Sequence, residues 1–242
     1  MLFLYRIYQI CIMLPLMLVD TVLASVFTIL GTLIPGTQRT IGYYVPKVWA
    51  RVMAWVTPVR VLVHGRENID PHTSYVFVAN HQGAYDIFAI YGFLNHNFVW
   101  MMKKSLERIP LVGYACRRSG HIFVDRAGAS AVQHTMETAE NRLQGGRSVV
   151  VFPEGTRSRT GKLGVFRRGA YKLAVEFNLP VVPITIDGSY AIMPITAKLP
   201  RPGRIVLTIH KPIMPGDDGH DVQQLMEQSR QAIASSLPAD QR

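Results

Sequence analysis

The feature that most restricts the fold of this chain is a repeated alternation between short β-type runs and helical patterns. Seven apolar runs rich in Val, Ile and Phe lie at residues 59–64, 75–80, 98–102, 121–125, 148–152, 181–186 and 204–210. Helical patterns lie at residues 84–94, 129–143, 170–177 and 221–236, and residues 238–242 resemble a frayed tail. This alternation predicts an α/β fold with a mostly parallel or mixed central sheet flanked by helices.

An apolar leader precedes the alternating region. Residues 7–34 are almost continuously apolar and would extend about 42 Å as a helix, which exceeds the ~30 Å hydrocarbon core of a bilayer. Asp20 interrupts the run, and Trp49 and Trp55 oppose Lys47 and Arg51 on a second, amphipathic pattern at residues 41–57. We predict a two-helix membrane anchor in residues 1–57, joined to an α/β domain in residues 58–242. The same helices could instead pack in the core of a soluble protein, and the number of crossings stays open.

The charge of the chain is concentrated outside this leader. The 242 residues carry a formal net charge of +10, and residues 1–38 contain only Arg6 and Asp20 as charged side chains. A basic body suits an anionic membrane surface, an acidic substrate or nucleic acid. Cys11 and Cys116 are the two cysteines, so the chain has neither a disulfide framework nor a cysteine-rich zinc site, which favours a reducing compartment.

The first chemically distinctive junction follows the run at residues 75–80. Asn80 and His81 end the run, and Asp86 lies five positions after His81 at the start of a predicted helix. This spacing allows the carboxylate to bind one imidazole nitrogen and leave the other as a base. The alternative is structural: His81 caps the helix and Asp86 lies in its first turn, where the helix dipole favours an acid.

The second junction, residues 152–158, follows the run at residues 148–152. Its sequence, Phe-Pro-Glu-Gly-Thr-Arg-Ser, predicts a tight loop with backbone N–H groups, hydroxyls and the planar donor fork of Arg157. Such groups hold phosphates. A solvated basic loop is the alternative.

The third junction, residues 120–126, ends in Asp125 and Arg126 after an apolar run. Arg126 and one of the lysines Lys103 and Lys104 could close a cationic pocket over the same anion. Alternatively, Asp125 and Arg126 pair with each other at the surface, which contributes at most ~1 kcal/mol.

Taken in this order, the junctions resemble the glycerophospholipid acyltransferase family that carries an NHxxxxD motif. The matching segments are Asn80-His81 to Asp86, residues 103–113, residues 120–126, residues 152–158, residues 166–170 and residues 182–184. The resemblance implies that His81 is the general base and that Asp86 orients it. It also implies that Glu154, Gly155, Thr156 and Arg157 bind the substrate phosphate, with Lys104 and Arg126 as helpers.

Within the family, the chain most resembles bacterial enzymes that act on 1-acyl-sn-glycerol 3-phosphate. The implied reaction transfers a fatty acyl group from acyl-CoA or acyl carrier protein to the sn-2 hydroxyl of lysophosphatidic acid, giving phosphatidic acid in phospholipid biosynthesis. The implied location is the bacterial inner membrane, with the catalytic domain facing the cytoplasm and contacting membrane lipids. We expect no cofactor, since no dinucleotide or Walker fingerprint occurs, no metal, since histidine spacing fits none, and no nucleic acid partner.

Two alternatives to this activity remain. Another lysolipid could be the acceptor, because the NHxxxxD motif and the phosphate loop are shared across acceptors. The chain could also be a noncatalytic, membrane-associated lipid-binding protein, for which loss of His81 or Asp86 would be the sequence signature. Both residues are present.

Overall fold

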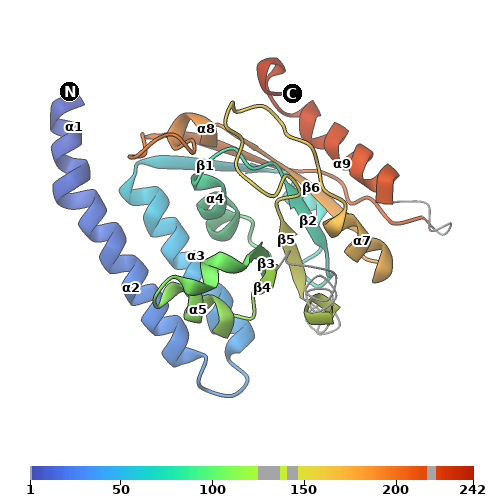
Figure 1. The fold of residues 1–242 in the computed structure, drawn as a ribbon, viewed down its shortest axis with the longest axis horizontal. Coiled ribbons are helices and arrows are strands. Elements are labelled where there is room, and N and C mark those ends of the chain that lie inside the picture. The colour runs from blue at the N-terminus through green and yellow to red at the C-terminus, as the bar shows by residue number, and fades with distance from the viewer. Residues whose placement is uncertain (1, 125–136, 141–146, 217–221) are drawn as a thin grey trace.

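The computed structural model describes residues 2–124, 137–140, 147–216 and 222–242, and these form a mixed sheet with helices on both faces (Figure 1). The described strands follow the order β1-β7-β6-β2-β5-β3-β4. Their bounds are β1 Val59–His64, β2 Val76–Ala79, β3 Phe98–Lys103, β4 Ile122–Val124, β5 Ser148–Val151, β6 Val181–Asp187 and β7 Gly203–Ile209. Each coincides with one of the predicted apolar runs, so the predicted α/β fold class is confirmed.

The helices account for the predicted helical patterns that fall on described residues. They are α1 Leu2–Tyr8, the π-helical η1 Gln9–Met13, α2 Leu14–Gly31, α3 Gln38–Val56, α4 Tyr85–Phe93, α5 Val112–Arg118, α7 Gly169–Glu176, α8 Ser189–Ile192 and α9 Val222–Ser235. Short 3₁₀ turns occur at η2 Arg66–Asn68, η3 Lys104–Arg108 and η4 Ala239–Gln241. Of the helix predicted at residues 129–143, only 137–140 lie among the described residues, and they are helical.

The sheet is buried on both faces, which explains why its strands read as continuous apolar runs. On β2, Phe77 and Ala79 face the cluster formed with α3 and α4, whereas Val76 and Val78 face the cluster formed with α7 and α9. This alternation follows from the two-residue period of a strand. The two clusters place one helical layer on each side of the sheet.

Strand direction sets where the chemistry lies. β2 pairs in parallel with β5 and β6, β5 with β3, and β3 with β4, while β6 and β7 pair antiparallel. The carboxyl ends of β2, β3, β4 and β5 therefore meet at one edge of the sheet. In open α/β sheets this edge is where ligands bind.

The apolar leader forms one long helical rod. Residues Phe3–Gly31 are long and apolar enough to cross a membrane, and 11% of their most apolar stretch is buried. Large apolar side chains such as Leu23 and Phe27 are 48% and 60% exposed. A rod with this much exposed apolar surface indicates membrane association.

The second leader helix, α3, belongs to the core of the α/β unit. Tyr43, Ala50 and Ala54 lie in the cluster that α4 and the sheet complete. On its other side, Trp49 Nε1 donates to Thr21 Oγ1 of α2 at 3.1 Å. Packing therefore continues across the predicted boundary at residue 57, and the division into an anchor and a domain stays a prediction.

The expectation of a frayed carboxyl-terminal tail is wrong. Leu237 is 2% exposed within the α7/α9 cluster, and residues 239–241 form the turn η4. Arg242 Nε donates to the carbonyl oxygen of Leu237 at 3.0 Å, and the carbonyl of Gln241 accepts from the N–H of Leu163 at 2.8 Å. These contacts hold the segment against the loop that follows β5.

The exposed leader surface predicts how the protein is retained on membranes. Replacing Leu23 and Phe27 by lysine places two charges on one face of α2, each costing up to ~3 kcal/mol in a bilayer. We expect the double variant to float with lipid vesicles to a much smaller extent than the parent. Lysines at the exposed Gln224 and Gln228 of α9 are the matched control, and equal flotation of both double variants would contradict a lipid contact at α2.

Candidate active site

The end of β2 is fixed by a side-chain amide that forms the hydrogen bonds of a strand backbone. Asn80 is fully buried; its Oδ1 accepts from the N–H of Ile186 at 2.7 Å, and its Nδ2 donates to the Ile186 carbonyl at 2.8 Å. The amide thus continues the pairing of β2 with β6 after the strand has ended. The backbone is then free to turn at the next residue, which is His81.

His81 and Asp86 form the predicted pair. His81 Nδ1 lies 2.7 Å from Asp86 Oδ2, and the same oxygen accepts the backbone N–H groups of Gln82 and Gly83 at 2.7 and 2.9 Å. Asp86 is fully buried in the first turn of α4, whereas the His81 side chain is 14% exposed. Because an ionised carboxylate only accepts, Nδ1 carries the proton and Nε2 keeps a lone pair for a substrate proton.

An aromatic stack fixes the plane of the imidazole. The ring of Phe152 lies 3.9 Å from that of His81 at an interplanar angle of 8°, and Trp100 stacks behind Phe152 at 5.4 Å. Sequence reasoning placed Phe152 at the end of a strand and the start of the predicted phosphate loop, and it missed the stacking of Phe152 and Trp100 behind the imidazole. The place of Phe152 directly before the Pro-Glu-Gly loop, at the edge where β2 also ends, was the available signal.

Glu154 joins the His81 turn to the loop after β5. It is 7% exposed; Oε1 accepts from the His81 N–H at 2.8 Å, and Oε2 accepts from the Gly164 N–H at 3.0 Å. Burial raises the pKa of this carboxyl, and the two backbone donors oppose that rise. A Cβ on Gly164 would lie 2.6 Å from Oε2, so glycine is needed for this approach.

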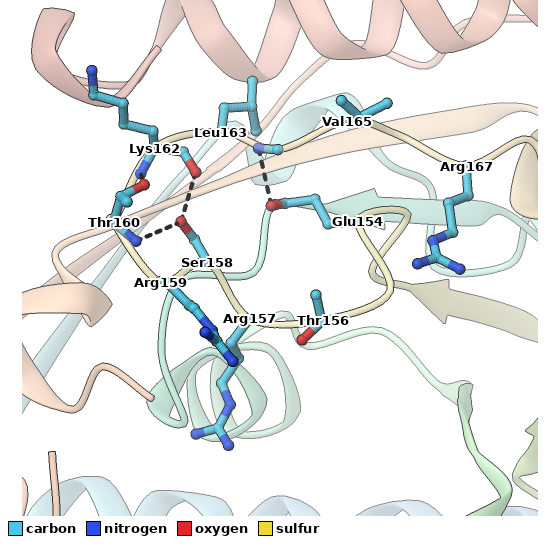
Figure 2. Close-up of a pocket in the computed structure, with 11 residues that line it drawn as sticks. Glu154, Thr156, Arg157, Ser158, Arg159, Thr160, Lys162, Leu163, Val165 and Arg167 are labelled. Atoms are coloured by element: carbon cyan, nitrogen blue, oxygen red, sulfur yellow. Dashed lines mark hydrogen bonds between the residues drawn. The ribbon is translucent and has the colours of Figure 1, made fainter. Parts of the chain in front are cut away.

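The loop lines an open, basic pocket of about 700 Å³, shown in Figure 2. The cationic side chains that line it are Arg157, Arg159, Lys162 and Arg167. Within the described part of the chain, none of these four side chains forms a hydrogen bond or an ion pair. The Ser158 N–H donates to the His81 carbonyl at 2.7 Å, which joins the loop that lines the pocket to the backbone of His81. Figure 2 shows Arg157 and Arg159 extending to the same side of the loop.

Most of the predicted site residues are brought together here. His81, Asp86 and Glu154 are linked by hydrogen bonds, and Thr156 and Arg157 line the pocket. Gly155 has a φ of +74°, which glycine tolerates, and it makes the turn in which its N–H donates to the Phe152 carbonyl.

Two predicted helpers are less well placed. Lys104 begins η3 directly after β3, at the same sheet edge, and is not among the residues that line the pocket. Arg126 and Asp125 lie outside the described residues. The assignments of substrate-binding residues therefore stay predictions. Glu154 also has a structural role, because it bridges two backbone segments.

A model of the acyltransferase family matches residues 60–187, which span β1 to β6 and contain all of these groups. The chain belongs to the acyltransferase family. Its resemblance to glycerophospholipid acyltransferases, inferred from the sequence, is thereby supported at the level of the family.

Named relatives show which members of the family this acyltransferase is similar to. The chain is 34% identical over 206 residues to a 1-acyl-sn-glycerol-3-phosphate acyltransferase of Chlamydomonas reinhardtii, covering 84% of this chain and 60% of that one. It is 31% identical to the chloroplastic enzyme of the same name from Arabidopsis thaliana, covering 83% and 55%. The chain thus spans little more than half the length of these relatives.

A solved structure supports the fold of the acyltransferase over most of its length. The crystal structure of the 1-acyl-sn-glycerophosphate acyltransferase of Thermotoga maritima matches with a TM-score of 0.68 at 28% identity. The match covers 86% of this chain and 88% of that one. The shared fold therefore extends beyond the residues of the family match.

The bridging carboxylate of Glu154 gives a stability prediction. Glu154→Gln keeps one carbonyl acceptor and turns an amide donor toward the other backbone N–H, so we expect a loss of about 1–3 kcal/mol. The measurement is the free energy of unfolding in detergent. Glu176→Gln, on the exposed end of α7, is the matched control. Equal stability of the two variants would show that the bridge contributes nothing.

Proposed function

We propose that this acyltransferase transfers a fatty acyl group from a thioester donor to the sn-2 hydroxyl of 1-acyl-sn-glycerol 3-phosphate, giving phosphatidic acid. The observation that supports the proposal is the hydrogen bond between the Ser158 N–H and the His81 carbonyl, which joins the loop that lines the basic pocket to the backbone of His81. An acceptor that bears a phosphate close to a reactive hydroxyl suits this arrangement, because the phosphate would bind in the basic pocket and the hydroxyl would approach His81. The names of the relatives from Chlamydomonas and Arabidopsis agree with this acceptor.

The proposed reaction uses the imidazole nitrogen of His81 that does not face Asp86. Nε2 removes the proton of the acceptor hydroxyl as the oxygen attacks the thioester carbonyl, and the imidazolium that forms is stabilised by Asp86 across 2.7 Å. When the tetrahedral intermediate collapses, the C–S bond breaks and the thiolate takes the proton from Nε2. An ester and a free thiol result, and no group on the enzyme is acylated.

The loop after β5 supplies the acceptor site in this proposal. The guanidinium of Arg157 offers a planar pair of donors to a phosphate, and Thr156 and Gly155 add hydroxyl and backbone donors. Lys104 and Arg126 serve as further cations from the neighbouring strand ends. Glu154 positions the loop through its two backbone contacts, because its carboxylate would repel a phosphate.

The remaining assignments complete the proposed reaction. The donor is acyl-CoA or acyl carrier protein, which acts as co-substrate, and the chemistry described above needs neither a cofactor nor a metal. The apolar rod of residues 3–31 indicates membrane association. We propose the cytoplasmic face of a bacterial inner membrane as the site, where the +10 charge would attract anionic lipids and the leader would contact membrane lipids.

The test of the activity is acyl transfer to a panel of acceptors. We expect the purified protein to acylate lysophosphatidic acid in preference to other lysophospholipids and glycerol 3-phosphate. His81→Ala should lower kcat at least ~100-fold with folding intact, since general base catalysis contributes about that much. A preference for another lysolipid would overturn the acceptor, and a His81→Ala variant within tenfold of the parent would overturn the role of the base.

The acceptor site is tested by Arg157→Lys, which keeps the charge and removes the planar fork. We expect the KM for lysophosphatidic acid to rise about tenfold while kcat and the KM of the donor change little. Arg60→Lys, on the exposed side of the edge strand β1, is the matched control. A rise confined to the donor's KM would instead assign the loop to the phosphates of the carrier.

A further inference from the structure

The carboxyl-terminal turn η4 contacts the candidate active site at two points. Gln241 Oε1 accepts from Gln82 Nε2 at 2.8 Å, and the Gln241 carbonyl accepts from the Leu163 N–H at 2.8 Å. Gln82 follows His81 directly and donates its own N–H to Asp86. Gln241 therefore lies between the His81–Asp86 turn and the loop that surrounds the basic pocket.

This loop needs to be held because it is long and irregular. Residues 152–168 form neither helix nor strand, and loops of this length are otherwise variable in conformation. Its first half is tied to the sheet edge by Glu154 and by the Ser158 N–H. Its last residues are held to its first residues by the Arg167 N–H, which donates to the Pro153 carbonyl at 2.9 Å.

Two glutamines contact the far side of the loop. Gln82 is 1% exposed, and its Nε2 donates both to the Gly161 carbonyl at 2.7 Å and to Gln241. With the bond from Leu163 to Gln241, these contacts hold residues 161–163. Arg157, Arg159 and Lys162 are carried by the same loop, so the position of its far side sets the shape of the pocket.

The turn that presents Gln241 is itself fixed. Leu237 is buried, the Gln241 N–H donates to the Pro238 carbonyl at 3.0 Å, and Arg242 Nε donates to the Leu237 carbonyl. The backbone carbonyl and the side-chain amide of Gln241 are thus presented from an anchored segment. An ordered latch costs less entropy on substrate binding than a loop that is ordered by the substrate.

We propose that Gln241 is a positioning residue: with Gln82 it latches the far side of the basic loop, so that the carboxyl-terminal segment sets the affinity for the phosphate-bearing acceptor. This inference rests on the proposed function for the identity of the acceptor. The latch itself rests only on the hydrogen bonds of Gln241 and Gln82. Gln241 acts through the loop and has no contact with reacting atoms.

The test uses Gln241→Met, Gln82→Met and the double variant in the full chain. Methionine keeps the length of the side chain and removes the amide, and Gln224→Met on the exposed face of α9 is the matched control. We expect Gln241→Met to raise the KM for lysophosphatidic acid about three- to tenfold, the effect of losing one neutral hydrogen bond, with kcat within twofold. The double variant should be no worse than Gln82→Met, since both changes break the same latch.

A second measurement separates the latch from the choice of acceptor. Amide hydrogen exchange should accelerate several-fold in residues 156–165 of Gln241→Met and stay unchanged in Gln224→Met. If no lysolipid is a substrate, the proposed function fails while the exchange result still tests the latch. Unchanged hydrogen exchange in Gln241→Met would overturn the proposal, and so would an acceptor KM equal to that of the parent. A general loss of function, in which KM rises, kcat falls and thermal stability falls to a similar extent, would also overturn it.

Discussion

The fully buried carboxylate of Asp86 is the group around which the site is organised. A buried charge costs several kcal/mol unless donors surround it, and here His81 Nδ1 and the N–H groups of Gln82 and Gly83 converge on one oxygen. That demand bends the chain sharply after β2. At Gly83 a Cβ would lie 2.6 Å from the Ser189 carbonyl, so the turn tolerates no larger residue. The start of α4 and the orientation of the imidazole follow from the same contacts.

A second buried carboxylate, that of Glu154, links the His81 turn to the loop after β5. Glu154 accepts one backbone N–H from the His81 turn and another from Gly164, so His81 and the loop that lines the basic pocket belong to one hydrogen-bonded unit. The stacking of Phe152 on the imidazole adds an apolar contact between the same two segments. A rigid relation between base and pocket suits an acceptor whose phosphate and hydroxyl are separated by a short, fixed distance.

The molecule has two surfaces of opposite character, one on the leader and one on the loop after β5. The rod of residues 3–31 exposes apolar side chains, whereas the loop after β5 exposes cations. Helix α3 joins the rod to the sheet, because Ala50 and Ala54 pack in the core of the sheet while Trp49 contacts Thr21 on the rod. The rod offers an apolar surface that suits acyl chains, and the loop after β5 offers cations that suit an anionic headgroup. The apolar surface and the cationic surface therefore support the same proposed function.

The sequence by itself determined what depends on near neighbours. The strand runs were predictable because apolar pattern and length are local, and the pairing of His81 with Asp86 because five residues fit one turn. Only the tertiary structure decided the strand order, the bridging task of Glu154 and the packing of Gln241. The partners of Glu154 and Gln241 at the His81 turn are 73 and 159 residues away. Such contacts leave no spacing pattern in the sequence. The residues around a loop glutamate, or around a glutamine near the carboxyl end, are the same whether its side chain faces water or binds a distant segment.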